Sequence, residues 1–333
     1  MTIPPHAHWI RVPRFMGDAV MIHSAIEPLR AAGLPLVVWG PKWVVDLFDG
    51  AEGYAAVVAE PDRKYSPWQA ARMLAQYRPA SVICFPKSQR PMAAAFLARV
   101  PLRLGCGDGI GRILLTHSVQ FYEQNTHFVT RYRSVVDRAF PHLPASAFIP
   151  FRPRPEALAR AEREKQNVAL GDYVVLAPGA NTDSKRLSVP LFQALGKRFA
   201  AMGLRPTIIG AGPDDSEIAK AIREGLPEAV DFTNQFSLAE SAAWIHGAKL
   251  LVGVDSGLAH LSAACGIPTL TAYGPTRPRH SAPWGPRVRV IRKEDLSCLE
   301  CMAFICPLEG HPCMTQLPVE HLWAAAIDLL KAP

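Results

Sequence analysis

The sequence has no long apolar run and no disulfide-rich pattern. No window of about 20 residues is free of charged residues, glycine and proline, so no transmembrane helix is expected. Residues 1–8 lack a basic stretch followed by an apolar run, which argues against a secretion signal and favours a cytoplasmic protein. The seven cysteines are odd in number, and four of them lie between Cys298 and Cys313, unlike the framework of a small secreted domain. We therefore expect free thiols.

Recognisable motifs for dinucleotide and nucleic-acid binding are also missing. Gly105 to Gly111 contains four alternating glycines, but no frame gives G-x-G-x-x-G between a strand and a helix, so we expect a loop. The net charge of +7 is uneven, because residues 1–150 hold 16 basic and 10 acidic residues and residues 151–333 hold 20 and 19. These basic residues are not interleaved with aromatics as in a nucleic-acid module. An anionic lipid headgroup or an acidic glycan fits better, and a plain solvated surface is the alternative.

Short apolar runs alternate with helical segments along the whole chain. This alternation predicts parallel sheets covered by helices on both faces, the α/β class. A chain of 333 residues suits two domains of roughly 150 residues each. Five prolines between residues 140 and 156 mark the best linker. We therefore predict Rossmann-like domains at 1–150 and 151–318, with a C-terminal helix in 319–333.

The most informative stretch begins with the apolar residues 250–254, which predict a buried parallel strand. Asp255 and Ser256 are typical N-cap residues, Gly257 lets a ligand approach the backbone, and a helix to Ala264 follows. Such a junction presents unpaired N–H groups and the positive end of a helix dipole, which is an anion site. His260, one turn later, could add a side-chain donor on the same face. The alternative is an ordinary helix cap with a packed histidine.

This stretch resembles the donor-site signature of glycosyltransferase family 9, the lipopolysaccharide heptosyltransferases. The family pattern D-[ST]-G-x-x-H-x-x-A-A followed by Y-G-P-T is matched by residues 255–264 and 273–276. The resemblance implies a GT-B fold, in which two Rossmann-like domains face across a cleft and the C-terminal helix returns to the first domain. It also implies an inverting, metal-independent transfer of heptose from ADP-L-glycero-D-manno-heptose to the Kdo or first heptose of the lipopolysaccharide inner core, at the inner-membrane surface.

The acceptor side would lie in the N-terminal half. Asp18 follows Gly17 at a predicted strand-to-helix turn, where the helix dipole tends to keep a carboxylate ionised. On the residues alone a helix cap is the alternative, whereas the family resemblance implies that Asp18 is the catalytic base. The residues predicted to bind the acceptor are Arg14, Gly17, Lys87, Arg90 and Arg112.

The donor side would lie in the C-terminal half. A departing diphosphate needs cations and N–H donors, and Lys185 supplies a point charge. The resemblance implies an acidic residue near the nucleoside, for which Glu217 is the candidate, and Asp255 would bind a sugar hydroxyl or hold its loop. Arg186 either assists Lys185 or is solvated. The other residues predicted to bind the donor are Gly179, Ala180, Asn181, Ser256, Gly257 and His260, although the family often has threonines at 180 and 181.

The four clustered cysteines follow the spacing C-x2-C-x4-C-x6-C, with a histidine at 311. The C-x-x-C half is typical of metal knuckles, so a structural zinc at Cys298, Cys301, Cys306 and Cys313 is an alternative to the thiols that we favour. Three other functions stay open: a family 9 transferase with another donor or acceptor, a sugar-nucleotide epimerase or hydrolase, and a non-catalytic nucleotide-sugar-binding protein.

Overall fold

The structure is a computed structural model that describes residues 3–61, 65–85, 88–107, 109–119, 126–143 and 147–332. It divides into two compact units, Met1–Pro155 and Glu156–Pro333. The unit boundary lies at the end of the predicted proline-rich linker, of which residues 144–146 lie outside the described ones. Among the described residues, no helix combines the length and apolar character needed to cross a bilayer.

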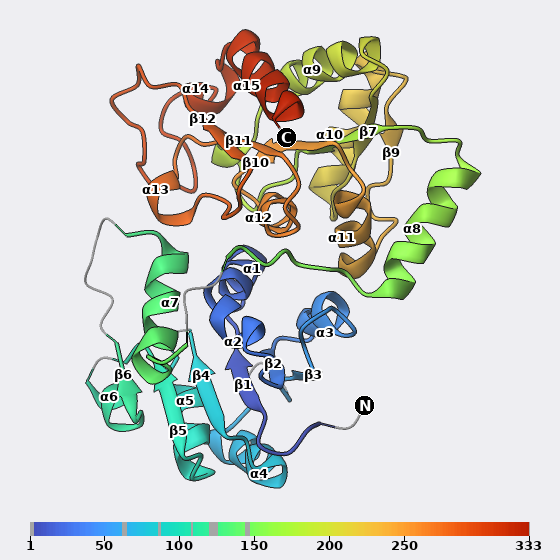
Figure 1. The fold of residues 1–333 in the computed structure, drawn as a ribbon. Helices are drawn as coiled ribbons and strands as arrows, with labels where there is room; N and C mark the ends of the chain where they lie inside the picture. The colour runs from blue at the N-terminus through green and yellow to red at the C-terminus, as the bar shows by residue number, and fades with distance from the viewer. Residues whose placement is uncertain are drawn as a thin grey trace. The chain divides into compact units, whose positions relative to one another are not determined.

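Each unit is built on a six-stranded parallel sheet (Figure 1). In the first unit the strand order is β3-β2-β1-β4-β5-β6, so the order reverses between β1 and β4. All of these pairs are parallel, which agrees with the alternation of strands and helices in the sequence. The strands are β1 His8–Arg11, β2 Leu36–Gly40, β3 Ala56–Ala59, β4 Ser81–Cys84, β5 Leu102–Gly105 and β6 His117–Ser118.

One face of this sheet packs on the helices α4 and α5. Trp9, Val37 and Val82 of the strands form a buried cluster with apolar residues of both helices, among them Leu74 of α4 and Met92 of α5. The helix α4 begins with a complete capping box. The helices of the unit are α1 Met16–Ala25, α2 Glu27–Ala31, α3 Trp43–Phe48, α4 Pro67–Tyr77, α5 Gln89–Leu97, α6 Ile110–Ile113 and α7 Phe128–Ala139.

The second unit repeats this topology. Its order is β12-β11-β10-β7-β8-β9, so the reversal lies between β7 and β10. The strands are β7 Tyr173–Ala177, β8 Arg205–Ile208, β9 Val230–Asp231, β10 Leu250–Val254, β11 Thr269–Ala272 and β12 Val288–Ile291. The helices are α8 Pro155–Asn167, the 3-10 turn η1 Asp183–Lys185, α9 Val189–Ala201, α10 Pro213–Gly225, α11 Leu238–His246, α12 Gly257–Ala264, α13 Pro278–Ser281, α14 Pro312–Thr315 and α15 Val319–Lys331.

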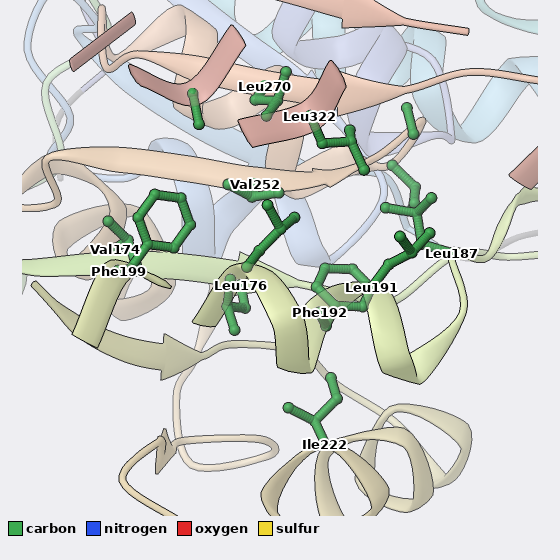
Figure 2. Packing of buried hydrophobic residues seen from close by; sticks show 14 of the residues in the cluster. Val174, Leu176, Leu187, Leu191, Phe192, Phe199, Ile222, Val252, Leu270 and Leu322 are labelled. Atoms are coloured by element: carbon green, nitrogen blue, oxygen red, sulfur yellow. The ribbon is translucent and has the colours of Figure 1, made fainter. Parts of the chain in front are cut away.

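The core of the second unit lies between this sheet and the helices α9, α10 and α15. Figure 2 shows Val174, Leu176 and Val252 of the strands meeting Phe192 of α9 and Leu322 of α15. All five side chains are fully buried. The buried face of the C-terminal helix is therefore part of the second unit's own core, while its predicted packing on the N-terminal domain stays a prediction.

Replacing Phe192 by alanine should destabilise the second unit by about 3–5 kcal/mol, because the fully buried ring leaves a cavity between α9 and the sheet. Urea denaturation of the full chain, followed by intrinsic fluorescence and far-UV circular dichroism, measures the change. The matched control is Phe304→Ala, since that ring is 76% exposed and its loss should cost no more than about 0.5 kcal/mol. Equal losses in the two variants would contradict the core assignment.

Candidate functional site

The predicted donor residues lie where the strand order of the second sheet reverses. The chain leaves β7 toward β8 and β9, and it leaves β10 toward β11 and β12. The loops that follow β7 and β10 therefore diverge at the carboxyl ends of two neighbouring strands. In open α/β sheets this is the position at which ligands bind. The first loop carries Lys185, and the second carries Asp255 and Ser256.

Lys185 and Asp255 form an ion pair across these two loops. Lys185 Nζ lies 2.8 Å from Asp255 Oδ2, and the two side chains are only 19% and 11% exposed. His260 Nε2 lies 3.8 Å from the other carboxylate oxygen, Oδ1, to which the Tyr273 hydroxyl donates a hydrogen bond of 3.1 Å. Burial raises the pKa of Asp255, but His260 and Lys185 outweigh it and hold the pKa well below its usual range. The site therefore contains a fixed carboxylate anion next to a lysine.

The start of α12 presents polar groups that lack partners. Ser256 is the N-cap residue, but its side chain makes no capping hydrogen bond. Within the described part of the chain, Ser256 Oγ, His260 Nδ1 and Thr276 Oγ1 are buried atoms without a hydrogen-bond partner. The His260 side chain as a whole is 4% exposed. Buried polar atoms normally find partners, so the unpaired Ser256 Oγ and His260 Nδ1 at the start of α12 are what a polar, anionic ligand would satisfy.

The two adjacent cations of the first loop have different partners. Arg186 pairs with Asp183 and, at 2.7 Å, with Asp214, and it also donates to the carbonyl oxygen of Ala180 at 3.4 Å. Arg186 therefore stabilises the loop through Asp183, Asp214 and the backbone, whereas Lys185 pairs with Asp255. Of the other predicted residues in this loop, Gly179 and Ala180 are half-buried and Asn181 is exposed.

Two acidic residues of α10 have different surroundings: Asp215 lies next to this loop, whereas the predicted Glu217 lies further along the helix. Glu217 is exposed on α10. The half-buried carboxylate of Asp215 accepts a 2.9 Å hydrogen bond from the Ala211 N–H and occupies the space that a side chain at Gly179 would need. Burial raises the pKa of Asp215. Its position in the first turn of α10 was a readable signal, because first-turn carboxylates lie near the preceding loop.

Asp18 lies in the first turn of α1 in the first unit. The N-cap residue is Phe15, so Asp18 is not the N-cap itself but lies two residues into the helix, where a carboxylate interacts favourably with the helix dipole. Burial and then the negative charge of Asp18 raise the pKa of Tyr132 on α7, a helix that packs against α1. Nothing in the local sequence pattern of α7 relates Tyr132 to α1, so this neighbour could not be found from the sequence.

The other predicted acceptor residues are mostly exposed. Arg14, Arg90 and Arg112 are exposed, Gly17 is half-buried, and Lys87 lies outside the described residues. The Arg90 guanidinium lies over the ring of Tyr65, 5.4 Å from its centroid.

The cysteine segment, residues 298–313, contacts the loop that follows β11 and the loop that carries Lys185. The Glu300 and Met302 N–H groups donate to the carbonyl oxygens of Gly274 and Pro275 at 3.0 and 2.8 Å. The Ser184 hydroxyl donates to Ala303 O at 2.9 Å. All four cysteines are free thiols, and burial together with the other three raises the pKa of Cys313 to about 11. Across the residues that the structure describes, no three His, Cys, Asp or Glu side chains are arranged to hold a metal ion.

Replacing Asp255 by asparagine should destabilise the protein at neutral pH, with a difference that shrinks in acid. The pKa of Asp255 is lower in the folded than in the unfolded chain, so its contribution is complete above the unfolded value of about 4 and is lost as the pH falls below it. Urea denaturation at about pH 7 and about pH 3.5 compares the variant with the wild type. Asp172→Asn is the control, since its exposed pair with Lys249 contributes little. A difference that grows in acid would contradict the assignment.

Comparisons with known proteins place the chain in a family. The family model described as glycosyltransferase family 9 (heptosyltransferase) matches residues 76–311, more than half of the chain. Lipooligosaccharide heptosyltransferase 2 of Haemophilus influenzae is 24% identical over 305 residues, covering 84% of this chain and 86% of that protein. The enzyme of the same name from Campylobacter jejuni is 31% identical over 161 residues, covering 47% of this chain and 50% of the relative's length.

The fold agrees with these matches. The structure of an E. coli ADP-heptose lipopolysaccharide heptosyltransferase II has a TM-score of 0.79 at 21% identity and covers 97% of this chain and 98% of its own. This likeness extends over both units, and it confirms the predicted GT-B class of two Rossmann-like α/β units. The chain belongs to glycosyltransferase family 9, the heptosyltransferases.

Proposed function

We propose that the protein transfers heptose from ADP-L-glycero-D-manno-heptose to the Kdo or first heptose of the lipopolysaccharide inner core, with inversion and without a metal. The observation that carries this proposal is the ion pair in which Lys185 Nζ lies 2.8 Å from Asp255 Oδ2. It lies at the same edge of the sheet as the start of α12, where Ser256 Oγ and His260 Nδ1 have no hydrogen-bond partner. Membership of family 9 and relatives named as lipooligosaccharide heptosyltransferases support the choice of sugar and acceptor.

The donor would bind through its diphosphate. Lys185 supplies the positive charge, and Ser256, Gly257 and His260 at the start of α12 supply N–H and side-chain donors. These groups stabilise the negative charge that grows on the leaving group as the bond to the anomeric carbon breaks. Further donors would come from the backbone amides of Gly179, Ala180 and Asn181. The acidic residue near the nucleoside would come from α10, where Glu217 is the predicted residue and Asp215 lies nearer the loop.

The acceptor hydroxyl would be activated by Asp18. The oxygen of the acceptor hydroxyl forms the bond to the anomeric carbon, and the hydroxyl proton passes to the Asp18 carboxylate. The bond between the anomeric carbon and the diphosphate oxygen breaks, and its electron pair leaves with ADP. Attack opposite the leaving group inverts the anomeric centre. The basic residues Arg14, Lys87, Arg90 and Arg112 would contact the anionic acceptor, together with the backbone of Gly17. A cytoplasmic protein that binds peripherally at the inner-membrane surface is the localisation that fits this acceptor.

Replacing Asp18 by asparagine should lower the transfer rate at least about 100-fold, because the isosteric amide cannot accept the proton. Product mass after incubation with ADP-heptose and truncated lipopolysaccharides measures transfer, and calorimetry with ADP measures donor-side binding. ADP affinity should be unchanged. Asp49→Asn, which removes the same charge from the C-cap of α3, should keep full activity. Normal turnover in Asp18→Asn would reject the base assignment.

If the four clustered cysteines are thiols, as we favour, the protein should contain less than about 0.2 zinc per chain when it is purified without added metal. Elemental analysis measures the metal, and thiol titration of the unfolded chain should find all seven cysteines reduced. One zinc per chain that is lost in Cys301→Ser would instead establish the alternative structural site.

A further inference from the structure

Tyr273 is a buried residue of the donor site to which the proposed chemistry gives no role. It directly follows β11 and is fully buried. Its single O–H proton is shared between two acceptors, Asp255 Oδ1 at 3.1 Å and the Ser281 carbonyl oxygen, at the end of α13, at 2.8 Å. Burial and then the charge of Asp255 raise the pKa of Tyr273 far above its ordinary value, so the phenol keeps its proton and remains a donor.

The two oxygens of Asp255 have different neighbours. Oδ2 faces Lys185 at 2.8 Å, and Oδ1 receives the Tyr273 hydroxyl, with His260 Nε2 at 3.8 Å. An ion pair with a lysine alone would not fix the orientation of the Asp255 carboxylate, because the lysine ammonium lies at the end of a flexible four-carbon chain. The Tyr273 ring is fully buried and its hydroxyl also binds the Ser281 carbonyl, so its hydrogen bond to Oδ1 leaves Oδ2 for Lys185.

We propose that Tyr273 is a positioning residue, which orients Asp255 and through it holds Lys185 where the donor diphosphate binds. This inference rests on the proposed function, because it assumes that Lys185 contacts the diphosphate. Without the phenol hydroxyl, the carboxylate and the lysine have more orientations, and ordering them on binding costs affinity. Tyr273 itself does not touch the donor in this proposal.

The test is the affinity of the full chain for ADP, measured by isothermal titration calorimetry. Tyr273→Phe keeps the ring and removes only the hydroxyl, and it should weaken ADP binding about tenfold, the size expected for one hydrogen bond to a charged group. The matched control is Tyr173→Phe. Tyr173 is the first residue of β7, at the amino end of the same sheet, and its buried hydroxyl donates to the Trp244 carbonyl oxygen. Its loss should therefore leave the ADP affinity unchanged.

A double-mutant cycle separates positioning from a structural role. Lys185→Ala alone should weaken ADP binding at least about tenfold, and adding Tyr273→Phe should weaken it no further, because the hydroxyl acts through the lysine. An additive loss in the double variant, or unchanged ADP affinity in folded Tyr273→Phe, would overturn the inference and leave the proposed function intact. Unchanged affinity in Lys185→Ala would overturn the proposed function itself.

Folding of the variants is checked by their thermal unfolding. If Tyr273→Phe does not fold, Asp255→Asn breaks the same link from the other side and should also weaken ADP binding. Unchanged ADP affinity in folded Asp255→Asn would then reject the positioning role.

Discussion

The ion pair between Lys185 and Asp255 depends on the register of two strands. β7 pairs with β10 in parallel, with Ala177 opposite Gly253, so the loops that follow both strands start side by side. A Cβ atom at Gly253 would lie 2.9 Å from the Ala177 carbonyl oxygen, so a side chain there would push the strands apart. Largely buried charges are costly unless they are paired, and this pairing requires that the strands stay in register. The donor site is thus a consequence of the sheet order.

The strands and their loops could be predicted from the sequence, but this pairing could not. The apolar run at residues 250–254 predicted β10 with its observed bounds, and with it the loop that carries Asp255. Which of two adjacent cations faces the site depends on partners far along the chain. Arg186 is engaged by Asp214, and Asp214 lies after β8, a neighbour of β7 that only the strand order identifies.

Two local details of helix register have simple physical causes. α1 begins at Met16, so Gly17 and Asp18 lie in its first turn and not in the turn before it. The sequence hides this start, because no capping side chain marks the N-terminus and a glycine at position 17 disfavours a helix. On α10, Glu217 and Asp215 are two residues apart. Successive helical residues turn by about 100°, so side chains two apart point to nearly opposite sides. The helix therefore places Asp215 beside the loop and leaves Glu217 exposed, a difference that depends on the exact start of the helix.

The cysteine segment gives a structural reason for one glycine of the Y-G-P-T motif. A Cβ atom at Gly274 would lie 3.0 Å from the Cys313 Cβ atom and would overlap its sulfur, so only glycine fits where this segment packs. Glu300 strengthens the contact, because its N–H binds the Gly274 carbonyl and its carboxylate pairs with Arg292 at 3.0 Å. The same loop carries Tyr273, whose hydroxyl contacts Asp255. The segment after β12 therefore supports the loop that holds Tyr273, and a substitution at Cys313 would act on the candidate donor site through backbone packing even when no metal is bound.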